Sequence, residues 1–145
     1  MARLETTELL ERFADALAAR YQIAPTIRYF RDVEQIELDA ETRYYLEPGS
    51  TLLERINVAG PRVIQTARLL TELVATYDEL DAAIQANVNR LVGIGRDLMR
   101  TPNFINGAFL TRVQTFRDAP SAYSVEGAEE RLTVYGGIEF EFAIE

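Results

Sequence analysis

The clearest pattern in the chain is a strict alternation of apolar and mostly acidic positions near its C terminus. Positions 138, 140, 142 and 144 are Ile, Phe, Phe and Ile, whereas positions 139, 141, 143 and 145 are Glu, Glu, Ala and Glu. A period of two is typical of an antiparallel strand that buries one face. The alternation starts at Leu132, and the pair Gly136 and Gly137 within it predicts a bulge or bend.

Two segments follow a helical period instead. Between residues 7 and 21, apolar positions recur every three or four residues, after a threonine at position 6 or 7 that can cap the helix. A second helix is predicted over 79–99, with Asp78 as its N-cap. Gly93 and Gly95 lie inside this second pattern, so they indicate close helix packing rather than a nucleotide-binding loop.

The remaining segments are rich in residues that favour strands. The segments expected to form strands, besides the C-terminal one, are residues 26–31, 42–46, 52–58, 64–77 and 108–117. Segment 64–77 fits both periods, but its β-branched residues favour a strand, and a helix there would make an improbably long helical run. Residues 47–50, Glu-Pro-Gly-Ser, predict a turn.

These elements predict a single α+β domain over residues 1–145. We expect a mixed, mostly antiparallel β-sheet with two main helices packed on it. Residues 32–61 are long and poorly patterned for a compact domain, and long irregular segments are often functional. We interpret this segment as an extended, β-rich contact arm that partners order.

The composition argues against most catalytic chemistry. The chain has no Cys and no His, and all 15 of its basic residues are Arg. These absences exclude thiol and imidazole catalysis as well as Schiff-base chemistry. The glutamates at 139, 141 and 145 can in principle hold a hard cation, but a solvated strand face is the favoured interpretation. We therefore expect no enzyme, no cofactor and no metal.

The charge is unevenly distributed. The net charge is −8, and acidic residues gather in segments 32–48 and 126–145. This negative charge disfavours tight binding to DNA. The acidic segments are either a solvated surface or a surface that repels a polyanion or contacts a basic partner. We expect neither a signal peptide nor a membrane-spanning segment.

Arginines and aromatic residues also gather late in the chain. Arg112 and Arg117 lie close in sequence to Phe109, Phe116 and Tyr123. These residue types are enriched at protein interfaces, so they form either a recognition surface or, for the two phenylalanines, part of the core.

The order of elements resembles the tail terminator family of long-tailed bacteriophages. In both, a helix and a β-rich segment precede a long strand, a second helix and two closing strands. The resemblance is carried by Asp78-Glu79-Leu80-Asp81 after the long strand, by Leu98-Met99-Arg100-Thr101-Pro102 at the helix end, and by LTVYGGIEFEF over residues 132–142. Residues 32–61 depart from the family's pattern.

The resemblance implies a structural virion protein, assembled in the host cytoplasm, that caps the head-proximal end of the tail tube. Terminators form a homo-hexameric ring that stops tube polymerisation and offers a docking surface to the head-completion or neck protein. They have no catalytic activity and no cofactor, and DNA is only their passing, repelled cargo. The alternatives are another head–tail junction protein (a neck, head-completion or sheath-adaptor protein), a small carboxylate-metal enzyme and a cellular interaction domain.

The candidate residues follow from this role. The expected protein contacts are Tyr44, Tyr45, Phe104, Ile105, Arg112 and Tyr123, of which Phe104, Ile105 and Tyr123 are expected to be exposed anchors. The residues expected to face an acidic lumen are Asp32, Glu34, Glu37, Asp39, Glu139 and Glu141.

Overall fold

We analysed a computed structural model, which describes residues 3–29, 43–57, 60–117, 121–123 and 131–145. Its elements in chain order are α1 (Thr6–Tyr21), β1 (Thr26–Ile27), β2 (Arg43–Asn57), β3 (Gly60–Thr76), α2 (Tyr77–Met99), β4 (Ala108–Arg117), β5 (Ser121–Tyr123) and β6 (Arg131–Ile144).

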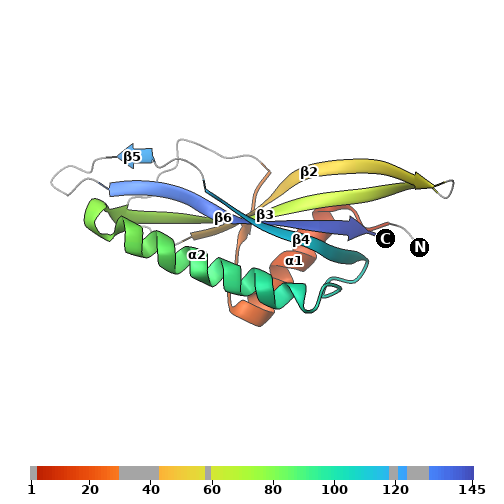
Figure 1. The fold of residues 1–145 in the computed structure, drawn as a ribbon, viewed down its shortest axis with the longest axis horizontal. Coiled ribbons are helices and arrows are strands. Elements are labelled where there is room, and N and C mark those ends of the chain that lie inside the picture. The colour runs from red at the N-terminus through yellow and green to blue at the C-terminus, as the bar shows by residue number, and fades with distance from the viewer. Residues whose placement is uncertain (1–2, 30–42, 58–59, 118–120, 124–130) are drawn as a thin grey trace.

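The strands form one mixed sheet in the order β1-β2-β3-β6-β4, and β5 pairs with β6 beyond the end of β4. Only the short β1–β2 pair is parallel. Both helices lie on the same face of the sheet, α1 against β1 and β2 and α2 against β3, β4 and β6 (Figure 1). The predicted α+β class, with two helices on a mostly antiparallel sheet, is therefore confirmed.

The alternating C-terminal segment forms a central strand of this sheet. Its even positions from Ile138 to Ile144 are buried, and Glu139 and Glu141 occupy the opposite face, as the period of two predicted. Phe13 of α1 packs edge-on against Phe140, with ring centroids 4.7 Å apart. Edge-to-face pairs of this kind add to the free energy gained by burying their area.

Residues 64–76 of the ambiguous segment 64–77 are part of a strand, whereas Tyr77 begins α2, one residue before the predicted N-cap Asp78. β3 pairs with β6 from Val63 to Thr76 without a register shift, and it pairs with β2 along its other edge. Up to Glu72 the strand has neighbours on both edges, which satisfy its backbone donors and acceptors and favour a strand where periodicity alone is undecided.

The predicted turn at 47–50 is wrong, because β2 continues through it. Pro48 lies opposite Ala67, and a bulge between Pro48 and Thr51 absorbs one extra residue. β1 covers β2 only at residues 45 and 46, so Pro48 stands where β2 has no described strand on its outer edge. A proline is tolerated there because no strand needs its missing N–H group.

Three smaller expectations also fail. Of the strand expected over 26–31, the described residues 26–29 form a strand only at Thr26–Ile27. The N-cap of α1 is Glu5, which makes no side-chain capping hydrogen bond. Thr6, one of the two predicted caps, lies inside the helix and its hydroxyl donates to Gln65. The register of β6 is regular at its two glycines, so no bulge occurs there; a Cβ at Gly137 would collide with the backbone of Leu69.

The two glycines of α2 have different surroundings. A Cβ at Gly95 would lie 2.7 Å from Cδ1 of Ile138 and 2.8 Å from Cγ1 of Val113, whereas a Cβ at Gly93 would meet nothing within 4 Å. The predicted close packing is thus confirmed for Gly95 and wrong for Gly93, which faces solvent.

This difference makes the two glycines a matched pair. We expect Gly93→Ala to stabilise the protein by about 0.5–1 kcal/mol, because alanine has the higher helix propensity. We expect Gly95→Ala to destabilise it by about 1 kcal/mol, because the new methyl group overpacks the contact between α2 and the sheet. Urea unfolding measures both, and a stabilising Gly95→Ala would contradict the packing.

The C-terminal ends of both helices are tied together by a hydrogen bond from the hydroxyl of Tyr21 to Asp97. Burial raises the pKa of Tyr21 from 10.0 to about 12, and the hydrogen bond to Asp97 adds to the rise. Since the folded-state pKa is raised, the stabilisation is complete below pH 10 and is lost as the pH approaches 12.

We therefore expect Tyr21→Phe to lower the free energy of unfolding at pH 8, and the difference from wild type to shrink between pH 10 and 12. Tyr29→Phe, at an exposed tyrosine, is the control and should leave the profile unchanged. A difference that stays constant with pH would show that Tyr21 acts through packing alone. Urea unfolding across this pH range decides between the two.

Candidate interaction surface

The β2–β3 hairpin projects at one end of the described fold (Figure 1). Residues 51–57 and 60–63 are here called the arm tip. The pairing of β3 with β6 ends at Val63 opposite Ile144, and Val63 pairs with Leu53, so the hairpin runs on as two strands alone only beyond this pair. The arm tip extends past the helices and past the C terminus (Figure 1). Two-stranded ribbons are marginal in water, so an arm of this kind gains from a partner.

The arm tip carries apolar side chains on both of its faces. Leu52 is 53% exposed and Leu53 is 67% exposed. Leu53 pairs with Val63 on the face that carries the helices, and Leu52 pairs with Ile64 on the other. Exposed leucines side by side at the end of a projecting hairpin are suited to a protein contact.

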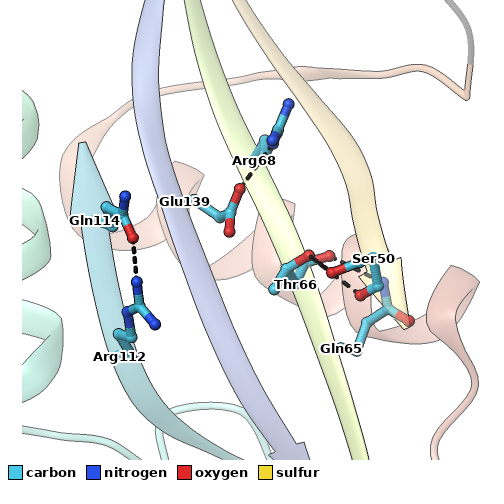
Figure 2. A network of polar contacts seen from close by, with 7 residues as sticks. All are labelled: Ser50, Gln65, Thr66, Arg68, Arg112, Gln114 and Glu139. Carbon is cyan, nitrogen blue, oxygen red and sulfur yellow. Dashed lines mark hydrogen bonds and ion pairs between the residues drawn. The ribbon is translucent and has the colours of Figure 1, made fainter. Parts of the chain in front are cut away.

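A buried polar cluster fixes the base of this arm. Gln65, which is 1% exposed, accepts hydrogen bonds from the hydroxyls of Thr51 and Thr6, the latter at 3.0 Å. Its amide group donates to the carbonyl of Thr66 at 2.9 Å, and the hydroxyl of Thr66 donates to the carbonyl of Ser50 at 3.1 Å (Figure 2). These contacts, here called the Gln65 cluster, join the first turn of α1 to both strands of the hairpin.

The sheet face opposite the helices, here called the open face, carries a row of alternating charges across the strands. Arg28 pairs with Glu47, and the side chain of Arg68 contacts Glu139 at 2.8 Å (Figure 2). The register places Arg68 directly between Glu47 and Glu139, and Gln114 lies beyond Glu139. Opposite charges on neighbouring strands stabilise a sheet modestly.

On the open face, the described side chains at strand positions, together with Arg28, carry equal numbers of positive and negative charges. The face carries five arginines and five glutamates, which are Arg28, Arg43, Arg62, Arg68, Arg112, Glu47, Glu54, Glu72, Glu139 and Glu141. Glu139 is paired with Arg68, and Glu141 lies opposite Arg112 in register. The two predicted lumen residues on this face therefore have arginines beside them, which reduces the negative field that was expected of them.

Three predicted contact residues have defined places. Tyr44 lies on the helix-bearing face, where its hydroxyl accepts a hydrogen bond of 2.9 Å from Arg90 of α2. Tyr45 lies on the open face with the guanidinium of Arg28 3.7 Å from its ring centre. Arg112 is exposed on β4 and hydrogen bonds to Gln114. Of the three, Arg112 is the one whose side chain is largely available to a partner.

The prediction that Phe104 and Ile105 are exposed anchors is wrong. Ile105 is only 3% exposed, and Phe104 packs into the aromatic core 5.6 Å from the ring of Phe13. The loop after α2 must return to the sheet, and folding these two residues inward closes the end of the core.

Other predicted residues cannot be placed. Asp32, Glu34, Glu37 and Asp39 lie outside the described residues, as does most of the first half of the predicted arm. Tyr123 lies in β5, whose backbone pairs with β6, but its side chain is outside the described part.

The interpretation of the sequence missed Leu52 and Leu53 as exposed groups, and it left Phe109 open between a recognition surface and the core. The adjacent leucines carried the signal, because successive strand residues point to opposite faces and one core cannot bury both. Phe109, which is 45% exposed, lies on the open face of β4 just before a bulge at residue 111 that changes the alternation. That bulge leaves no mark in the sequence.

Neither a metal site nor a membrane span is found in the described part of the chain. No group of three or more acidic residues there is placed to hold a metal ion. No described helix is long and apolar enough to cross a membrane. A cleft of about 310 Å³ lies between α1 and the chain end, lined by Arg3, Glu8, Arg12, Asn106 and Glu145 among others, and Arg12 already contacts Glu8 at 3.6 Å.

Comparisons with known proteins add no identification. Neither a scan of protein families nor a search of curated proteins found a match to the chain. The case for a function therefore rests on the fold and its surfaces.

The Gln65 cluster gives a direct test of how the arm is held. We expect Gln65→Leu to lower the free energy of unfolding by about 1–3 kcal/mol, because two hydroxyl donors at the base of the arm lose their acceptor. Gln114→Leu, at an exposed glutamine of β4, is the control and should change it by less than about 0.5 kcal/mol. Equal effects in thermal or urea unfolding would show that the cluster does not hold the arm.

Proposed function

We propose that this protein is a ring-forming structural subunit that caps the head-proximal end of a phage tail tube. The observation that carries the proposal is the projecting hairpin, which has the exposed side chains of Leu52 and Leu53 at its base. The order of elements, which resembles that of tail terminators, supplies the position in the particle.

The open face supports the same role. A ring around a DNA path needs an inner surface that neither binds phosphates tightly nor repels them strongly. A face with five arginines and five glutamates, several of them paired across strands, has little net field of its own. We propose that this face, including Glu139 and Glu141, borders the path of the DNA.

The contacts expected of a terminator divide over different surfaces. In a ring, one patch of each subunit meets a different patch of its neighbour, while the two ends of the ring meet different proteins. We propose that the helix-bearing face of the arm tip, which carries Leu53, reaches the tube protein, and that the sheet edges and other surfaces serve the ring itself and the head-completion protein.

Disruption of the gene in a phage that carries it tests the role. We expect overlong tails of variable length without heads in negative-stain images of the lysate. Tails of normal length beside filled, tailless heads would instead place the protein on the neck or head side, and intact infectious particles would rule out a role in the virion.

Complementation refines this experiment. Wild-type protein and Val88→Gln, which changes an exposed apolar residue of α2, should both restore normal tails. Leu53→Gln, at the arm tip, should fold but fail to restore them. Full rescue by Leu53→Gln would remove the arm tip from the contact with the tube.

A further inference from the structure

The described sheet has two long unpaired edges. On one side, β1 covers β2 only at residues 45 and 46, which leaves the β2 edge open from Pro48 to Asn57. On the other side, β4 pairs with β6 and with no further described strand; the N–H group of Leu110 donates to the carbonyl of Pro102, so the edge is open from residue 111 to Arg117. Open edges present unpaired backbone groups that can join another strand.

The two edges have the polarity needed to pair with each other in different copies. β2, β3, β6 and β4 are successively antiparallel, so β4 runs opposite to β2. When β4 of one copy lies beside β2 of the next, the antiparallel order therefore continues across the junction. Because the edges lie at opposite ends of the sheet, the contact is head-to-tail, which is the type that generates rings.

The exposed side chains of the two edges are complementary. Glu54 of β2 and Arg112 of β4 are both exposed, and both lie on the open face, since Glu54 pairs with Arg62 and Arg112 with Glu141. An antiparallel register that places Glu54 opposite Arg112 also places Leu52 opposite Gln114. It keeps the open faces of the two copies on the same side.

We propose that the β2 edge of one copy pairs with the β4 edge of a second copy as an antiparallel continuation of the sheet, with Glu54 opposite Arg112. The inference deepens the proposed ring and rests on it, because it names the contact by which neighbouring subunits join. Each edge is therefore occupied by the opposite sheet edge of another copy of this protein.

The absence of cysteine in the natural chain makes a covalent test specific. The double variant Glu54→Cys/Arg112→Cys places two thiols on directly opposed strands, where the distance between Cα atoms suits a disulfide. Oxidation of the concentrated protein should give a ladder of crosslinked species on a non-reducing gel. Each single variant should give at most a dimer.

A matched control pairs Glu54→Cys with Asp15→Cys, an exposed residue of α1, and should give no ladder. Charge reversal supplies a second measurement that needs no oxidation. Glu54→Arg alone should weaken self-association, measured by analytical ultracentrifugation, by about tenfold or more, and addition of Arg112→Glu should restore it.

The outcomes separate the edge contact from the wider function. A double variant that crosslinks no further than its single variants, or a charge swap that restores nothing, overturns the edge pairing. If gene disruption still gives overlong tails, the capping role stands and the subunits join through another surface. If the ladder forms but disruption leaves particles intact, the edge pairing stands and the capping role fails.

Discussion

The pairing of β3 with β6 is the contact on which the rest of the fold depends. The two strands run together from Val63 to Thr76 without a register shift, and every other strand joins one of them directly or through β2. This register turns Ile138, Phe140 and Phe142 toward the helices, where Phe13 packs on them. A slip of one residue would turn the glutamates of β6 into the core, so burial and register enforce each other.

The helices cover one face only, and this asymmetry shapes the surface chemistry. The face covered by the helices is built mainly from buried apolar side chains. On the open face, arginines and glutamates alternate across the strands, so that side chains left in water are held by their neighbours. In the arm tip no helix covers the sheet, so Leu52 and Leu53 stay exposed, although Glu54 still lies opposite Arg62 on the open face.

Much of the fold could be predicted from the sequence, because β6 and the two helices have strong hydrophobic periods. Propensity also assigned β3 correctly, where periodicity alone was ambiguous. The turn at Pro48 could not be excluded, since whether a proline interrupts a strand depends on whether that edge has a neighbour. Phe104 and Ile105 were misjudged for a similar reason: a loop residue's burial depends on what lies beneath it. That residues 32–61 form a contact arm stays a prediction, and the exposed leucines within this segment were not anticipated.

The position of both helices on one side of the sheet makes the subunit a wedge. A row of such wedges joined through their sheet edges has its bulk on one side and a thin surface on the other. Steric crowding between helical layers then forces the row to curve with the helices on the convex side. In a closed assembly of this kind, the helices form the outer wall and the sheets form the bore. In the proposed ring, the side of the sheet on which the chain places α1 and α2 thus decides which residues face the bore.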